Sequence, residues 1–353
     1  MADSYFVERN SKNLKKLNEL LLELPHFCKS YFIGIENTTS PLSRLNYAYD
    51  LRIFFDYVEK RVFVNKRIKD MMIKDLEDIT VTDFECFLSY LTEYEFEGEI
   101  HRCSLKAKAR KLCTLRSFYK YFFNREMIIA NTPAKIKTPK IKDAEIIKLE
   151  SNETATLLDT AESGEGLSKR QKSYHNVTKT RDLAILSLFL GTGIRISELV
   201  GINCDDINFD NNSFVITRKG GSRTILYFSK ETAKDLYNWY VKRAEIKNLP
   251  AEEDALFLSI QNKRINVRTV EFLVKKYAKI VTPLKHITPH KLRSTFGTSL
   301  YKETGDIYMV ADFLGHKDVN TTRKHYASIS EDSRRQAIKH VKLREENEEN
   351  NEN

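Results

Sequence analysis

Residues 180–228 read TRDLAILSLFLGTGIRISELVGINCDDINFDNNSFVITRKGGSRTILYF, and this stretch contains two kinds of hydrophobic pattern. The apolar run ahead of Gly191-Thr-Gly193 predicts a buried helix, the glycines predict a turn, and a second helix follows them. The pattern then alternates, because Ser213–Thr217 and Arg223–Phe228 flank the glycine-containing segment Arg218–Ser222, which predicts a β-hairpin. The stretch therefore predicts helices packed with a small antiparallel sheet.

Further helix boundaries follow downstream. The Thr288–His290 segment, with Pro289 at the first helical position, predicts a helix start capped by threonine. Gly305 is placed to end that helix, Asp306 to begin the next, and Gly315 to end it in turn.

The N-terminal part is predicted to be mainly helical. Leucines recur at helical spacing over residues 14–24, and aromatic and aliphatic residues do so over 45–58. Thr80 is the predicted N-cap of a helix over residues 81–94. A last helix is expected from about Ser104 to Asn124, with an apolar face and a basic flank. The basic residues on this flank are Lys106, Arg110 and Lys120.

Residues 131–148, NTPAKIKTPKIKDAEIIK, combine two prolines with several lysines and lack periodicity, as expected of an extended connection between domains. The Glu- and Asn-rich residues 341–353 are predicted to be disordered. The sequence therefore predicts one helical domain before the connection and one mixed domain after it.

The composition narrows the functional classes. Among 353 residues, 58 Lys and Arg against 49 Asp and Glu give a net charge of +9, which favours nucleic acid first and an anionic membrane second. The 20 Phe and 17 Tyr exclude wholesale disorder.

Five scattered cysteines without a CxxC pair predict neither disulfides nor a zinc finger. The longest nearly apolar run, Leu183–Leu190, is far below the roughly 20 residues of a membrane span. With no secretory signal pattern at the N-terminus, a cytoplasmic location without membrane insertion is expected.

Several charged residues downstream of the connection are candidates for chemistry, although each has an ordinary alternative. Arg195 and Glu198 share one helical face, as a surface ion pair also does. His290 and Arg293 lie in the first turn of a predicted helix, where backbone N–H groups favour an anion, but exposed helix starts also contain such residues. Lys219 occupies the predicted hairpin tip, where a solvated lysine is the usual interpretation.

Two further candidates lie near the C-terminal end. His316 follows the helix-ending Gly315, and Tyr326 lies ten residues further on. Any single tyrosine of seventeen is more simply explained by packing. The candidates form an ordered set of arginine, hairpin lysine, His-x-x-Arg, Gly-His and tyrosine. If the set had no catalytic role, the ordinary explanation of each of these residues would have to be correct at the same time.

This ordered set resembles the tyrosine recombinase family of site-specific DNA strand-exchange enzymes. Their active site contains two arginines, a lysine, two histidines (or a histidine and a tryptophan) and a nucleophilic tyrosine. The resemblance covers the connection and residues 152–335, and residues 38–125 look like the helical core-binding domain of the family. Within the family the sequence is most similar to the Xer recombinases that work as a single protein, through Leu24-Pro25 and residues 46–55 (NYAYDLRIFF).

The resemblance implies a mainly α fold with the tyrosine recombinase architecture. An N-terminal helical, SAM-like core-binding domain would precede a C-terminal mixed α/β catalytic domain with a small antiparallel sheet. We accordingly divide the chain into an N-terminal helical extension (1–37), a core-binding domain (38–130), a basic linker (131–150), a catalytic domain (151–340) and a disordered tail (341–353).

The resemblance also implies roles for the cationic residues. A phosphodiester under attack develops negative charge, which preorganised cations stabilise. Arg195 and Arg293 would bind the scissile phosphate through planar guanidinium groups, and His316 would add a further donor. Glu198 would hold the Arg195 segment in place.

By the same resemblance Tyr326 is the nucleophile, His290 its general base, and Lys219 the acid that protonates the leaving 5′-oxygen. Attack gives a 3′-phosphotyrosine and a free 5′-hydroxyl, so no metal, ATP or other cofactor is expected. The family hairpin commonly reads Gly-Lys-Gly, whereas this chain has Arg218-Lys219-Gly220-Gly221, with Arg218 and Arg223 as neighbouring cations.

The expected partner is double-stranded DNA carrying specific recombination sites. The helix of residues 104–124 is predicted to enter the major groove, with its three flanking cations on phosphates. The linker lysines are predicted to follow the DNA backbone, although a charge run is also typical of a solvated linker: Lys135, Lys137 and Lys140. The resemblance further implies a homotetramer on two sites, with an activating division or accessory protein as an additional partner.

Several functions remain open from the sequence. Xer-like chromosome dimer resolution is the preferred one, and an integrase of a phage or mobile element uses the same residues. A non-catalytic DNA-binding protein on the same fold is the alternative from another class, but such a protein has no need of Tyr326. A tyrosine-using DNA-relaxing enzyme would share the covalent intermediate.

Overall fold

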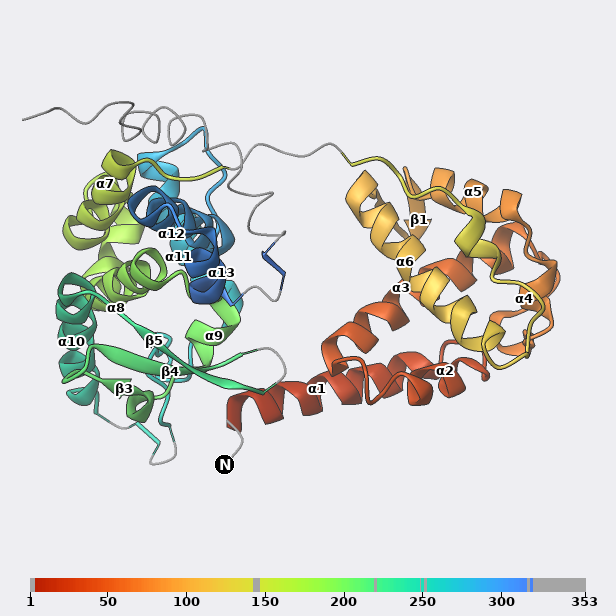
Figure 1. The fold of residues 1–353 in the computed structure, drawn as a ribbon, viewed down its shortest axis with the longest axis horizontal. Coiled ribbons are helices and arrows are strands. Elements are labelled where there is room, and N and C mark those ends of the chain that lie inside the picture. The colour runs from red at the N-terminus through yellow and green to blue at the C-terminus, as the bar shows by residue number, and fades with distance from the viewer. Residues whose placement is uncertain are drawn as a thin grey trace, which may run out of the picture. The chain divides into compact units, whose positions relative to one another are not determined.

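The computed structural model describes residues 4–141, 147–218, 221–247, 249–250, 253–315 and 318–319. The chain divides into two compact units, Met1–Ala144 and Glu145–Asn353, whose internal structures are shown in Figure 1. No helix of the described ranges is long and apolar enough to cross a membrane.

Helices dominate the first unit. Its elements are α1 (Ser4–Leu21), α2 (Cys28–Gly34), α3 (Pro41–Arg61), η1 (Ile68–Asp70), α4 (Asp75–Asp78), α5 (Val81–Tyr90), β1 (Tyr94–Phe96), β2 (Glu99–His101), α6 (Leu105–Phe123) and η2 (Thr132–Lys135). Thr80 caps α5 as predicted, but α5 ends at Tyr90 instead of continuing to residue 94, because Tyr94 begins the β1–β2 hairpin. The hairpin turn has positive φ at Glu97 (55°) and Gly98 (80°), as hairpins with two-residue turns require.

The core of the first unit is rich in aromatic residues. Phe54 of α3 stacks on Phe84 of α5 with ring centroids 5.4 Å apart, and Tyr31 of α2 meets Phe118 of α6 edge to face at 5.1 Å. Leu17 of α1 is buried in the same core. Residues 4–34 therefore pack with α3 and α6 in one core.

The predicted helix of residues 104–124 is confirmed as α6. The side chain of its N-cap residue Ser104 accepts a hydrogen bond from the Ala107 N–H, and Asn124 is the C-cap. Of the apolar positions that the spacing predicted, Ala109, Leu112, Leu115, Tyr119 and Phe122 are buried, whereas Leu105 at the start of the helix is exposed.

The segment after α6 folds back onto it. Arg116 of α6 donates from Nε to the Pro133 carbonyl (3.1 Å), from Nη2 to the Ile136 carbonyl, and from Nη1 to Thr138 Oγ1 (2.8 Å). Ile136 is buried in the core of the first unit. The chain is therefore anchored to this unit as far as Thr138.

The second unit combines helices with a three-stranded sheet. Its elements are α7 (Ser151–Ser163), α8 (Lys169–Thr192), α9 (Ile196–Gly201), η3 (Cys204–Asp206), β3 (Ile207–Asn208), β4 (Ser213–Thr217), β5 (Arg223–Tyr227), α10 (Lys230–Ala244), α11 (Val267–Val281), α12 (Pro289–Thr304) and α13 (Ile307–Leu314). The sheet is antiparallel in the order β3-β4-β5 (Figure 1). In the predicted hairpin, Ser213 pairs with Tyr227 and Thr217 with Arg223. The expected mainly α fold with a small antiparallel sheet is confirmed.

Helix α8 is the centre of the second unit, where it packs against α7, α10 and α12. Its apolar second half was predicted, but its polar first half, which starts after the N-cap Ser168, was not. Its Asp182 carboxylate is 1% exposed and accepts hydrogen bonds from Lys276 Nζ (2.8 Å) and Tyr277 Oη (3.0 Å) of α11. Next to this group, His175 Nδ1 lies 3.2 Å from Tyr277 Oη. Polar contacts thus join α8 to α11 inside the core.

The predicted boundaries of α12 and α13 are confirmed. Thr288 occupies the N-cap position of α12, although its side chain makes no capping hydrogen bond. Gly305 and Gly315 end the two helices with φ of 66° and 57°, and Asp306 Oδ1 accepts from two N–H groups in the first turn of α13. The Leu149 N–H donates to Thr295 Oγ1 of α12 (3.0 Å), which anchors the start of the second unit.

Candidate active site

Three successive backbone carbonyls at the end of α13, those of residues 313–315, accept hydrogen bonds from three arginines. Arg218 Nη2 lies 3.4 Å from the first oxygen, Arg293 Nη2 bonds the second, and Arg195 Nη2 lies 3.0 Å from the third. The last carbonyls of a helix lack partners within it and carry partial negative charge, so they attract cations. The end of α13 therefore gathers arginines from the α8–α9 turn, the end of β4 and α12.

Arg293 is the most deeply buried of the three. Its residue is 5% exposed, and its Nη1 donates to the Gly193 carbonyl over 2.6 Å. Gly193 ends α8 with φ of 62°, and a Cβ there would collide with the ring of Phe296. A glycine at this position lets the turn approach α12, so that Arg293 connects the end of α8 with the end of α13.

Arg195 is positioned by Glu198 at the start of α9. The Glu198 carboxylate accepts from the Arg195 backbone N–H (2.9 Å) and from Arg195 Nη1 (2.9 Å). The Glu198 side chain is 3% exposed, whereas that of Arg195 is 34% exposed. The carboxylate thus fixes the direction of a guanidinium that solvent still reaches.

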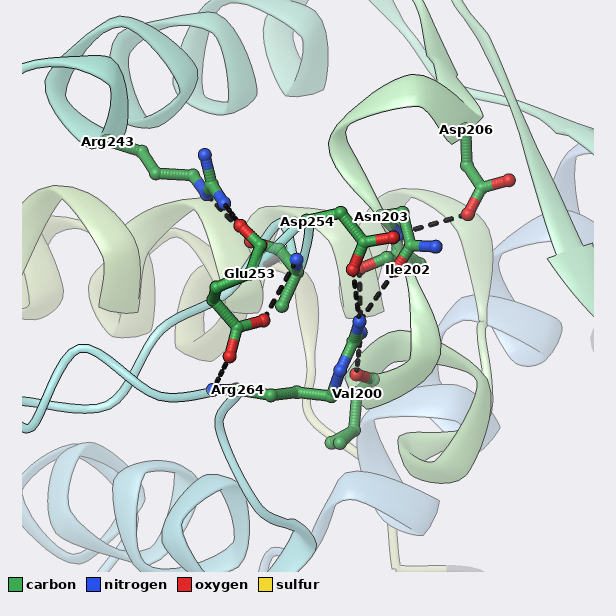
Figure 2. A network of polar contacts seen from close by, with 9 residues as sticks. Val200, Ile202, Asn203, Asp206, Arg243, Glu253, Asp254 and Arg264 are labelled. Carbon is green, nitrogen blue, oxygen red and sulfur yellow. Dashed lines mark hydrogen bonds and ion pairs between the residues drawn. The ribbon is translucent and has the colours of Figure 1, made fainter. Parts of the chain in front are cut away.

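The other end of α9 is held by Arg264, which Figure 2 shows at the centre of a polar network. Arg264 Nη1 donates to the carbonyls of Val200 (3.1 Å) and Ile202 (3.2 Å). Its Nη2 donates to Asn203 Oδ1 (2.7 Å) and Asp254 Oδ1 (3.0 Å). This residue was not predicted, because nothing in the sequence of the irregular segment between α10 and α11 indicates that it reaches α9.

His290 is the second residue of α12 and is exposed, one helical turn before the buried Arg293. Lys219, His316 and Tyr326 lie outside the described residues, as does the predicted tail of residues 341–353. Arg218 directly precedes Lys219, and Gly315 directly precedes His316; both preceding residues are described. The site that can be seen therefore consists of the three arginines, Glu198 and His290.

The predicted DNA-binding residues belong to the first unit. Lys106 and Lys120 are exposed on α6, and Lys135, Lys137 and Lys140 are exposed on and after η2. Arg110 is half exposed, with both Nη atoms bonded to the Asp50 carboxylate of α3.

Asp50, which was not predicted from the sequence, organises the basic face of α6. Its side chain is 0% exposed, and it also accepts from Lys111 Nζ (2.9 Å) and Thr114 Oγ1 (2.9 Å). Three neighbouring residues of α6 thus converge on one buried carboxylate. This arrangement fixes the rotation of α6 against α3.

Comparison with known proteins identifies relatives that match most of the chain. The phage integrase family matches residues 148–332. The chain is 32% identical to "Tyrosine recombinase XerC" of Caldanaerobacter subterraneus subsp. tengcongensis over 328 residues, covering 90% of this chain and 86% of that protein. It is 30% identical to "Tyrosine recombinase XerS" of Lactococcus lactis subsp. cremoris over 356 residues, covering 93% and 98%.

Solved structures share the fold. The XerH site-specific recombinase bound to its difH substrate superposes with a TM-score of 0.61 at 20% identity, over 85% of this chain and 79% of that chain. A lambda integrase dimer bound to a core site gives a TM-score of 0.58 at 17% identity, over 84% and 95%. The resemblance predicted from the ordered site residues is confirmed: the chain belongs to the phage integrase family of tyrosine recombinases, enzymes that transfer DNA strands, and the two relatives named above are Xer recombinases.

Proposed function

We propose that this site-specific recombinase cuts and rejoins duplex DNA through a covalent 3′-phosphotyrosine formed on Tyr326. The observation that best supports the proposal is the convergence of Arg195 and Arg293 on the turn that leads to residue 316. A guanidinium has five N–H donors, so groups that bond carbonyl oxygens retain donors for a phosphate. Cations fixed before the substrate arrives stabilise developing negative charge without further reorganisation.

The chemistry follows from these groups. The Tyr326 oxygen forms a bond to phosphorus while the bond to the 5′-oxygen breaks. Because a tyrosine hydroxyl has an ordinary pKa near 10, it requires a base, and we assign that role to His290. Lys219 gives a proton to the leaving 5′-oxygen, and His316 donates to the phosphate. The phosphotyrosine conserves the phosphodiester energy, so a 5′-hydroxyl of a partner strand can reverse the step without ATP.

DNA binding is assigned to both units. We propose residues 38–130 as the core-binding domain and 151–340 as the catalytic domain, joined by the linker of residues 131–150. Lys106, Arg110 and Lys120 of α6 would contact phosphates in and beside a major groove, and the lysines after η2 would follow the backbone: Lys135, Lys137 and Lys140.

The preferred biological role is chromosome dimer resolution in the cytoplasm. Four copies would assemble on two recombination sites, exchange strands in pairs through a Holliday junction, and respond to an activating division or accessory protein. Similarity to XerC and XerS over at least 90% of the chain supports this role. An integrase of a mobile element would use the same chemistry on the ends of that element.

The test is a suicide-substrate assay with nicked duplexes, tiled from the chromosome around the replication terminus and around the gene. In EDTA and without ATP, the wild type is expected to form a protein–DNA adduct that survives denaturation. Tyr326→Phe should bind the same duplex without forming the adduct. Tyr308→Phe, which changes a tyrosine that is 71% exposed on α13, serves as the matched control and should retain the adduct.

Each outcome has a definite meaning. An adduct with a terminus duplex supports dimer resolution, and an adduct only with duplexes flanking the gene supports the mobile-element role. A wild type that shifts DNA on every duplex but never forms an adduct overturns the catalytic proposal in favour of a DNA-binding protein. An adduct that persists in Tyr326→Phe overturns the assignment of the nucleophile.

A further inference from the structure

Arg218 lies at the base of the β4–β5 hairpin and contacts a turn almost a hundred residues away. Its Nη2 lies 3.4 Å from the Phe313 carbonyl. Its guanidinium also occupies the position that a Cβ on Gly315 would take, so this glycine leaves the space that the arginine fills. Gly315 has φ of 57°, in the left-handed region that glycine adopts without strain. The Arg218 side chain thus fills the space that a side chain at position 315 would need.

The surroundings of Arg218 are unusual for a hairpin cation. Its Nε is buried and has no hydrogen-bond partner among the described residues. Burial lowers the pKa of the Arg218 guanidinium below its ordinary value. The positive charge of Arg195 also lowers this pKa, whereas the negative charges of Glu198 and Asp312 raise it. An arginine remains charged in such a position, so its inward placement carries a cost in lost hydration.

Arg223 at the other base of the same hairpin provides the contrast. Its side chain is 63% exposed, and Nη2 pairs with Asp206 Oδ1 over 3.0 Å at the surface. Two arginines thus flank one hairpin tip, one directed into the protein and one directed into solvent. An exposed arginine such as Arg223 can attract DNA through its charge. Such an attraction does not explain why the Arg218 side chain points into the protein.

We infer that Arg218 is a positioning residue, which fixes the base of the β4–β5 hairpin to the turn after α13. The inference rests on the proposed function of Lys219 and His316. Residue 219 follows Arg218 directly and residue 316 follows Gly315 directly, and consecutive Cα atoms lie about 3.8 Å apart. A contact between Arg218 and Gly315 therefore fixes, relative to each other, the two described residues that directly precede the proposed catalytic positions.

The consequence is a defined effect on the rate of cleavage. A misplacement of about 1 Å in a catalytic group can lower a rate by roughly 10²-fold, even when the substituted residue does not touch the substrate. Removal of the Arg218 side chain should therefore slow the formation of the adduct more than it weakens DNA binding. A lysine at this position keeps the charge but loses the planar group that covers Gly315, so it should restore only part of the rate.

The first experiment measures single-turnover adduct formation and equilibrium binding on the nicked duplex that reacts with the wild type. Arg218→Ala should lower the rate by about 10- to 100-fold and change the dissociation constant by less than about threefold. Arg223→Ala removes the same charge from the same hairpin and should leave the rate of the bound complex within about threefold of wild type. Equal losses of rate in both variants, or a loss confined to binding, would overturn the inference.

The second experiment tests the contact itself with Gly315→Ala in two backgrounds. In the wild type, the added methyl collides with the Arg218 guanidinium and should slow adduct formation. In Arg218→Ala the collision is removed and only the strain of an alanine at φ of 57° remains, so Gly315→Ala should cause a smaller fold loss of rate there than in the wild type, as expected for coupled sites. Losses that multiply independently would overturn the inference.

Failure of the proposed function is distinguishable from failure of this inference. A wild type without an adduct overturns the proposed function, whereas a reactive wild type with an unaffected Arg218→Ala overturns only the positioning role.

Thermal unfolding of the wild type, the two single variants and the double variant provides a readout that needs no DNA. The decrease in Tm caused by Gly315→Ala should be smaller when Arg218 is absent, and equal decreases in both backgrounds would exclude the contact.

Discussion

The two units hold their clusters of cations by different means. In the first unit, Arg110 and Lys111 of α6 bond one buried carboxylate, Asp50. In the second unit, Arg218 and Arg293 donate to backbone carbonyls at the end of α13. A carboxylate cancels one positive charge, but a carbonyl carries no net charge and leaves that of its partner intact. Asp50 therefore serves as a structural support, whereas the carbonyls at the end of α13 orient Arg218 and Arg293 without cancelling their charge, and Glu198 is the carboxylate that orients Arg195 there.

The strongest test of this contrast is Arg293→Ala. If the guanidinium keeps its charge for the scissile phosphate, its removal should slow single-turnover adduct formation by about 10³-fold, or roughly 4 kcal/mol. Arg293→Lys should recover only part of this loss, because an ammonium cannot replace the planar fork. Arg268→Ala, at an exposed position of α11, is the charge-matched control. A loss below about tenfold would place Arg293 outside the reaction.

The second test is Asp50→Ala, which leaves the buried Lys111 without its counter-ion. We expect the free energy of unfolding to fall by about 3 kcal/mol, because breaking a buried ion pair leaves an uncompensated charge. Urea unfolding would measure the change. Asp56→Ala on the same helix removes a surface pair with Lys60 and should cost at most about 1 kcal/mol. Similar costs for the two variants would show that Asp50 does not support the structure of the first unit.

A third test uses pH to separate the units. Burial lowers the pKa of His175 in α8, so the folded state favours its neutral form. The unfolded chain then binds more protons near the ordinary histidine pKa of about 6.5, and the stabilisation from neutral His175 is lost as the pH falls through that value. Unfolding of the second unit should therefore become easier between pH 7.5 and 5. His175→Gln should reduce this pH dependence, whereas His26→Gln, at an exposed site, should not. An unchanged pH dependence in His175→Gln would contradict the assignment.

The smallest expected effect concerns the exposed lysines of α6. Lys120→Ala should weaken binding of the reactive duplex severalfold and reduce the slope of log affinity against log salt by about 1, as expected for one lost phosphate contact. Lys12→Ala on α1, where Lys12 pairs with Glu8, should leave the slope unchanged. A slope that does not change in Lys120→Ala would remove this residue from the proposed DNA interface.

The features that the sequence predicted are local ones. Thr80, Ser104, Asp306 and Gly315 mark helix ends because a cap depends on residues within one turn. The β1–β2 hairpin was missed because strands of three residues are too short to display alternation.

Contacts between residues that are far apart in the chain could not be predicted from the sequence. Asp50 lies 61 residues before Lys111, and no periodic pattern connects them. Arg195 and Arg293 were identified through the family resemblance, but their meeting at the end of α13 depends on how α8, α9 and α12 pack. The inward direction of Arg218 depends on the same packing.

The anchoring of the chain by Arg116 also limits how far the two units can move apart. Thr138 is bonded to the first unit and Leu149 to the second, so the tether between these two positions consists of ten residues, 139–148. A fully extended chain of this length reaches at most roughly 40 Å. When one unit has bound DNA, the tether holds the other at an effective concentration that short linkers raise to the millimolar range. Under the proposed function, in which both units contact one duplex, this linkage makes the joint binding tighter than that of either unit alone, and lengthening the tether should weaken it.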